Sequence, residues 1–139
     1  MSEPPASLVK RVSDLVSAIS RDPYGIDPIT GMTALQALRW LYDAATAAGT
    51  PHPFLTETMA DETVDPHEAI RLYEIAIEQC AQFPGEPIYT KRRDMEERLH
   101  RLGEVERARA QFELAIADAK HEGELEEAQY LAEYLQKFY

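Results

Sequence analysis

The chain has 139 residues, a formal net charge of −11, and 45% hydrophobic and 28% charged residues. A chain of this length buries roughly two-thirds of its unfolded surface in one core, so the fold requires neither a disulfide nor a metal. The negative charge disfavours nucleic acid and anionic membranes as partners, because their phosphate groups would repel it.

The compartment is suggested by cysteine usage and by the start of the chain. Cys80 is the single cysteine, which excludes an intramolecular disulfide. The first residues lack the apolar run of a secretory signal, and no segment approaches membrane-spanning length. We therefore expect a cytoplasmic protein that does not enter a membrane.

Charge is unevenly distributed along the chain. Residues 1–48 carry a net charge of −1, residues 49–87 carry −7, residues 88–103 carry +2, and residues 104–139 carry −5. A basic segment is thus flanked by acidic ones.

Apolar residues at three- and four-residue steps predict two helices in residues 1–48. The first runs from Pro5 to about Arg21 and is followed by turn signals over residues 22–31. Thr33 and Gln36 have the spacing of a capping box, which predicts that the second helix starts there; Gly49 ends it.

Residues 49–64 show no convincing periodicity and are predicted to form a long loop. Phe54 and Leu55 lie in this stretch. They either pack into the core or form part of a contact surface. The core interpretation is favoured, because buried aromatic residues are commoner than exposed anchors.

The remaining residues, 65–139, predict four more helices. Asp65, Pro66 and Glu68 form a strong helix start, since Asp caps a helix and Pro suits its first turn. The four helices are expected over 65 to about 83, 88–102, 104–120 and 125–138. The prediction is therefore a single all-α domain of about six helices arranged as antiparallel hairpins.

Small and aromatic residues recur at matching spacings in two of these helices. The positions are Gly103, Ala108, Phe112 and Ala115 in the downstream copy, and Ala69, Tyr73 and Ala76 in the upstream copy, 39 residues earlier. This pattern resembles the second helix of a tetratricopeptide repeat (TPR), and the resemblance covers about half of the chain. The first helix departs from the family, because Arg92, Met95, Glu96 and Leu99 stand where an aromatic residue, Leu, Gly and Tyr are expected. A generic helical bundle is the alternative.

The resemblance implies that the first helix of each pair lines a concave groove for a peptide or helix of another protein. The groove-facing positions of the basic helix are Thr90, Arg93, Glu97, His100 and Arg101. A basic groove suits an acidic segment or a C-terminal carboxylate. Alternatively, the basic side chains of this helix pair with the acidic helices around them.

The sequence offers little support for catalysis. Glu96 and His100 have the i, i+4 spacing that puts two ligands on one helical face, but a structural zinc site needs four ligands. The sequence has no glycine-rich phosphate loop, no nucleophile elbow and no HExxH motif. We expect neither an enzyme nor a cofactor or metal site.

The expected function is therefore binding of another protein. Small acidic helical proteins of this type resemble bacterial immunity proteins, which neutralise a toxin, and secretion chaperones; a peptide-binding regulatory scaffold is a further alternative. We favour the immunity role, because an acidic surface that includes Glu124, Glu126 and Glu127 suits the basic cleft of a toxin.

A homodimer is a further possibility. The last predicted helix and the residue after it carry four aromatic residues that are possible contacts, and ordinary core packing is the alternative. These residues are Tyr130, Tyr134, Phe138 and Tyr139.

Overall fold

The computed structural model describes residues 4–49 and 51–139. Within them it contains seven α-helices, one short 3₁₀ helix and no strand beyond an isolated bridge between Ile26 and Thr33. The elements are α1 (Ala6–Arg21), α2 (Ala34–Ala47), α3 (Pro53–Asp61), α4 (Pro66–Gln79), η1 (Cys80–Gln82), α5 (Tyr89–Arg101), α6 (Val105–His121) and α7 (Leu125–Phe138). The all-helical prediction is confirmed.

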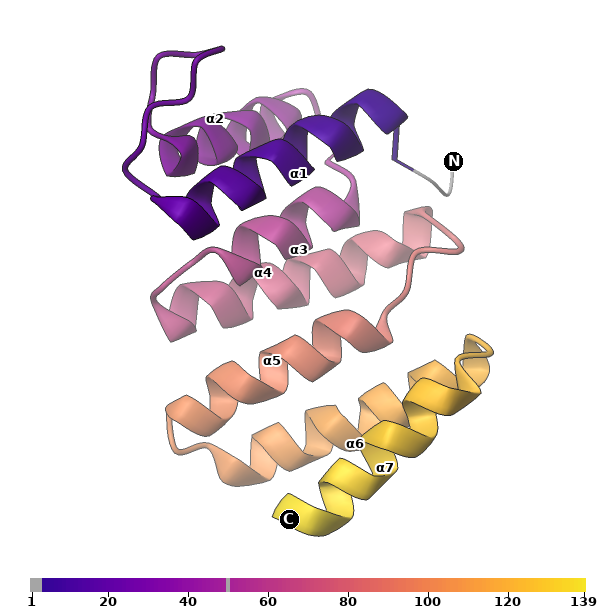
Figure 1. The fold of residues 1–139 in the computed structure, drawn as a ribbon. Coiled ribbons are helices and arrows are strands. Elements are labelled where there is room, and N and C mark those ends of the chain that lie inside the picture. Colours follow the sequence, from indigo (N-terminus) through magenta and orange to yellow (C-terminus); the bar gives the residue numbers. More distant parts are fainter. Residues whose placement is uncertain (1–3, 50) are drawn as a thin grey trace.

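The helices stack in chain order, from the α1–α2 pair at one end to the α6–α7 pair at the other (Figure 1). Each helix packs against the next one along the chain. Side-chain ion pairs also join alternate helices, because Lys91 of α5 binds Glu57 of α3 and Arg93 of α5 faces Glu127 of α7. This arrangement is compatible with a helical repeat.

The helix starts and stops follow local chemistry that the sequence displays. Thr33 Oγ1 accepts a hydrogen bond from the backbone N–H of Gln36 at 3.1 Å, and Gln36 Oε1 accepts one from Thr33 N–H at 3.1 Å. The Asp65 carboxylate caps α4 by accepting from the N–H of Glu68 at 3.3 Å. Gly103 ends the turn after α5 with a φ of 77°, a left-handed conformation that favours glycine.

The prediction of a long loop over residues 49–64 was wrong, because this stretch contains α3. His52 Nδ1 accepts from the N–H of Phe54 at 3.0 Å, and Pro53 occupies the first turn, so α3 has a defined start. Six of its nine residues are buried, and the polar Thr56 and Thr58 are among them, so the sequence shows no separate apolar stripe with a helical period. The chain therefore has seven helices in its described part rather than six.

Apolar side chains fill two connected regions of the stack. The larger extends from α1 to the start of α6, and the smaller lies between α6 and α7. The small and aromatic positions of the repeat pattern are buried, as close helix packing requires. These are Ala69, Tyr73 and Ala76 in α4, and Ala108, Phe112 and Ala115 in α6.

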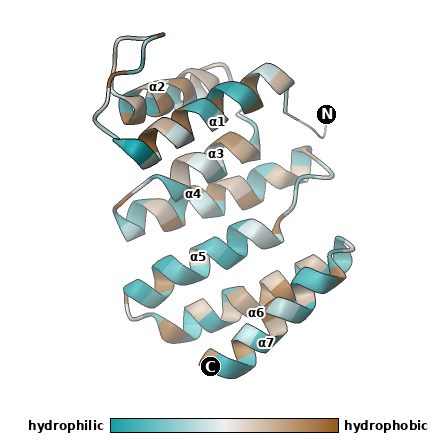
Figure 2. Cartoon of the chain, in the orientation of Figure 1, coloured by the Kyte–Doolittle hydropathy of each residue, from teal (hydrophilic) through white to brown (hydrophobic). Residues whose placement is uncertain are grey.

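Helix α5 is the exception to this apolar packing. It packs against both α4 and α6, yet most of its residues are hydrophilic (Figure 2). Lys91 has no exposed surface, and Glu96 is also buried. Charged groups in such a position require partners, because an unpaired buried charge is strongly unfavourable.

Candidate functional site

The basic groove predicted on α5 is only partly assembled. Glu97, His100 and Arg101 line a cleft of about 410 Å³ between α5 and α7, together with Glu96, Tyr134 and Phe138. Arg93 and Thr90 lie nearer the start of α5 and are not among its lining residues. The structure thus brings together three of the five predicted groove residues.

Each of the five Lys and Arg side chains of α5 forms an ion pair with an acidic side chain. Lys91 Nζ lies 2.9 Å from a Glu57 oxygen and 3.1 Å from a Glu86 oxygen, and it also donates to the Pro87 carbonyl at 2.7 Å. The other pairs are Arg92 with Asp118, Arg93 with Asp94 and Glu127, Arg98 with Glu97, and Arg101 with Glu97. These contacts favour the alternative in which the basic residues pair with their acidic neighbours.

The two apolar candidates of residues 49–64 belong to the core. Leu55 is 1% exposed, and Phe54 is partly buried against the larger apolar region. This is the core interpretation that the sequence favoured. Neither residue offers the freely exposed surface that a contact role requires.

The three acidic candidates lie at the start of α7. Glu124 and Glu126 are exposed, whereas the Glu127 carboxylate faces the Arg93 guanidinium at 3.8 Å. Carboxylates in the first turn of a helix interact favourably with its dipole, so part of their role is structural. Glu124 and Glu126 remain available to a partner.

The aromatic residues at the end of the chain divide into two groups. Tyr134 packs between Phe112 and Phe138, with ring centroids 4.8 Å and 4.6 Å away. The Tyr139 hydroxyl donates to Glu96, so this tyrosine also contacts its own chain. Tyr130 and Phe138 are 62% and 56% exposed and are the residues of this group that a second molecule can reach.

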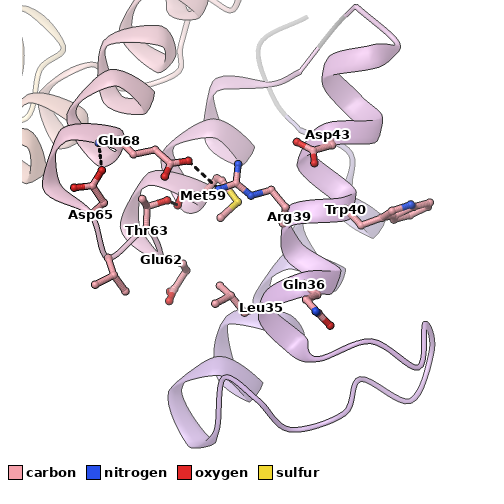
Figure 3. Close-up of a pocket in the computed structure, with 11 residues that line it drawn as sticks. Leu35, Gln36, Arg39, Trp40, Asp43, Met59, Glu62, Thr63, Asp65 and Glu68 are labelled. Carbon is pink, nitrogen blue, oxygen red and sulfur yellow. Dashed lines mark hydrogen bonds and ion pairs between the residues drawn. The ribbon is translucent and has the colours of Figure 1, made fainter.

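A larger cleft, which the sequence did not reveal, lies between α2 and the α3–α4 connection (Figure 3). We name it the acidic cleft; its volume is about 540 Å³. Its lining residues are Leu35, Gln36, Arg39, Trp40 and Asp43 from α2, and Met59, Glu62, Thr63, Val64, Asp65 and Glu68 from the facing side.

Four carboxylates and one guanidinium line this cleft. Arg39 pairs with Glu68 at 2.9 Å, and Asp65 caps α4, which leaves Asp43 and Glu62 as the carboxylates open to a ligand. Burial raises the pKa of Glu62 above its usual value, and the Arg98 guanidinium partly opposes this. A cation entering the cleft would therefore stabilise the charged form of Glu62.

Apolar surface accompanies these charges. Trp40 is 55% exposed and Val64 is 84% exposed, whereas Met59, which also lines the cleft, is buried. In Figure 3 the Trp40 ring projects outward from α2. An exposed tryptophan beside unpaired carboxylates suits a basic protein surface that carries an apolar or aromatic side chain.

Two groups that could have served catalysis or metal binding, Glu96 and Cys80, are engaged or unreactive. Glu96, half of the proposed Glu96–His100 pair, accepts from the Tyr139 hydroxyl. Burial raises the pKa of the Cys80 thiol to about 11, which disfavours the reactive thiolate at neutral pH. Among residues 4–49 and 51–139, no group of three or more His, Cys, Asp and Glu side chains is placed to hold a metal ion.

The fold is an all-helical stack that carries a carboxylate-lined cleft beside α2. Comparison with known proteins gives no match to any family model, curated protein or solved structure. Along the described part of the chain, the helices are too short or too polar to cross a bilayer.

Proposed function

We propose that this chain is a non-catalytic protein-binding module whose acidic cleft receives a basic surface of another protein. The observation that supports this most is the combination of Asp43 and Glu62, which line one cavity, with the exposed Trp40, whose ring projects outward from α2 at the edge of that cavity (Figure 3). Charge complementarity accelerates encounter, and a tryptophan at the centre of an interface commonly supplies much of the binding energy.

The role we favour is that of an immunity protein, which occupies the basic cleft of a toxin and thereby blocks it. The net charge of −11 supports this role, because it steers a cationic partner toward the chain from a distance. Toxins that act on nucleic acid need basic clefts to hold phosphate groups. The resemblance to helical repeats agrees with binding, since such stacks present extended surfaces to partners.

The alternatives use other surfaces or other partners. A peptide-binding scaffold would use the α5–α7 cleft, but the guanidinium of Arg101 there already pairs with Glu97 at 2.6 Å. A secretion chaperone would bind its partner without blocking the activity of that partner. Isolation of the partner, followed by an activity assay with and without this chain, separates the immunity and chaperone roles.

The experiment is recovery of the partner with the tagged protein from its native lysate, followed by binding kinetics with the purified partner. The Asp43→Lys, Glu62→Lys variant reverses the two open carboxylates of the cleft. The Glu124→Lys, Glu126→Lys variant changes the net charge equally at the start of α7 and is the matched control. We expect at least about a tenfold slower association for the cleft variant at low salt, and a much smaller change for the control.

The tryptophan provides a second test in the same assay. Trp40→Ala should raise Kd by about 30-fold through faster dissociation, which corresponds to a hot-spot residue. Tyr130→Ala removes a comparably exposed aromatic side chain on α7 and should leave Kd nearly unchanged. Equal effects of the two substitutions would contradict the assignment of the cleft as the binding site.

A further inference from the structure

The buried histidine at the start of α3 has two ring nitrogens with different surroundings. His52 is 5% exposed. Its Nδ1 atom accepts a hydrogen bond from the backbone N–H of Phe54 at 3.0 Å and thereby caps α3. Its Nε2 atom is buried and has no hydrogen-bond partner within residues 4–49 and 51–139; Glu86 Oε2 lies 4.0 Å from it. The ring is therefore bonded on one side and unsatisfied on the other.

The cap determines where the ring carries its proton. A ring nitrogen that accepts a hydrogen bond has no proton of its own, so the neutral His52 ring is protonated on Nε2. A doubly protonated ring has two donors and no acceptor, and it cannot accept from the Phe54 amide. Protonation of His52 and this cap of α3 therefore exclude each other. Histidine side chains ordinarily change charge between about pH 5 and pH 8, so the choice falls in an accessible range.

Two electrostatic effects move a protonated ring in the same direction. The positive end of the α3 dipole repels a cation at the cap position. The Glu86 carboxylate, near Nε2, attracts that cation. Because the two nitrogens lie on different edges of the ring, an approach of Nε2 to Glu86 draws Nδ1 away from the Phe54 amide. Protonation thus exchanges one partner for the other.

The charged groups of the neighbouring elements leave an excess of negative charge around Glu86. Lys91 of α5 pairs with Glu86 at 3.1 Å and with Glu57 of α3 at 2.9 Å, so one ammonium serves two carboxylates. Glu122, which follows α6, accepts from backbone N–H groups at the start of α5. Burial raises the pKa of the Cys80 thiol to about 11, so this neighbour is neutral. A proton on the ring would balance the second carboxylate.

Aromatic side chains enclose the histidine. The ring centroid of Phe83 lies 4.5 Å from that of His52, and the centroid of Phe54 lies 6.5 Å away. This enclosure limits solvation of a charged ring by water, so a protonated ring requires a partner from the protein. Glu86 is the carboxylate that stands within reach, and it belongs to the same connector as Phe83.

We propose that His52 is a proton-operated latch between α3 and the connector of residues 83–88. The neutral ring caps α3, whereas the protonated ring leaves the Phe54 amide and binds Glu86. Acidification therefore releases the first turn of α3 and fastens the ring to the connector. This inference goes beyond the proposed function and does not depend on it, so its test requires no partner protein.

The first experiment follows the ring nitrogens of the ¹⁵N-labelled protein by nuclear magnetic resonance from pH 8 to pH 5. We expect the ring proton of His52 on Nε2 at pH 8 and protons on both nitrogens at pH 5. Glu86→Gln keeps an oxygen for Lys91 but removes the charge, so the midpoint of the His52 titration should fall by at least about one pH unit. A proton on Nδ1 at pH 8, a ring that stays neutral at pH 5, or an unchanged midpoint in Glu86→Gln overturns the inference.

The second experiment measures hydrogen exchange of the Phe54 amide at pH 7.5 and pH 5.5, expressed as protection relative to the unfolded chain. We expect protection to fall about fivefold at the lower pH, which corresponds to the usual contribution of a helix cap. His52→Asn keeps a capping oxygen that does not titrate, so its protection should be equal at both pH values. His67→Asn removes an exposed histidine from the first turn of α4 and is the matched control, which should retain the fivefold fall.

The comparison also excludes the other group that titrates in this range. Burial raises the pKa of Asp61 to about 7, and His52→Asn retains this carboxyl. A loss of protection that persists in His52→Asn overturns the latch and assigns the pH dependence to Asp61. If circular dichroism shows that His52→Asn does not fold, Glu86→Gln decides, because its Phe54 amide should stay more protected at pH 5.5 than that of the unmodified protein. Equal protection of these two proteins at pH 5.5 contradicts the latch.

Discussion

Asp61 couples the stability of the α3–α4 pair to pH. Its carboxylate accepts the Tyr73 hydroxyl at 2.5 Å. Burial raises the pKa of Asp61 to about 7, and the nearby carboxylates of Asp94 and Glu57 add to this, while the Tyr73 hydrogen bond and Arg98 oppose it. The folded state thus holds the proton more tightly than the unfolded state does. The contribution of Asp61 to stability is therefore greatest below its unfolded pKa and falls as pH rises from about 4 to about 7.

The magnitude follows from the size of the shift. A fully buried carboxyl would lose about 1.4 kcal/mol per pH unit between the unfolded and folded pKa values, but the Asp61 residue is exposed, so solvent screening reduces its contribution to about 1 kcal/mol or less. Asp61→Asn keeps an oxygen that accepts from Tyr73 but never ionises. We expect the stability of this variant relative to the unmodified protein to improve by up to about 1 kcal/mol between pH 5 and pH 8.

The assay is urea unfolding followed by far-ultraviolet circular dichroism at pH 5 and pH 8. Asp43→Asn is the control, because it removes one exposed carboxyl from α2 and reports the effect of net charge alone. A stability difference between Asp61→Asn and the unmodified protein that is the same at both pH values would refute the argument.

Three further changes test the packing and the ion pairs. Lys91→Met removes the buried ammonium that pairs with Glu57 and Glu86, and so leaves both carboxylates without a cation. It should lower the free energy of unfolding by about 3–5 kcal/mol in urea titrations. A loss below about 1 kcal/mol would contradict the buried network. Ala108→Leu overfills a position with 0% exposure and should cost about 1–3 kcal/mol by the same method, whereas no loss would show that the α5–α6 contact is loose. Arg93→Glu with Arg101→Glu reverses surface pairs worth about 0–1 kcal/mol each, so the fold should persist. If binding of the isolated partner disappears in this last variant, the peptide groove on α5 replaces the acidic cleft as the site.

The sequence predicts most of the helices because their ends carry local signals. The last helix is expected over 125–138, and α7 spans Leu125–Phe138. The capping box at Thr33 forms as expected. Helix α3 could not be found in this way, because it buries polar Thr56 and Thr58 together with its apolar residues, and its sequence therefore lacks an amphipathic period.

The candidate site is harder to predict than the fold. The pairing of the basic helix with its acidic neighbours follows from the alternation of charge along the chain, and the structure shows those pairs. The acidic cleft combines side chains of α2 with those of residues 59–68, and periodicity does not specify how these two segments face each other. Two signals were nevertheless present, namely the charge of −7 in residues 49–87 and the lone Trp40.

The most direct test of the central claim is the association rate of the isolated partner at low salt. The Asp43→Lys, Glu62→Lys and Glu124→Lys, Glu126→Lys variants are compared, since both shift the net charge equally. Binding through the acidic cleft predicts association at least about tenfold slower for the first variant and within about threefold of the unmodified rate for the second. Equal slowing of both variants, or stronger slowing by the change on α7, would contradict the claim.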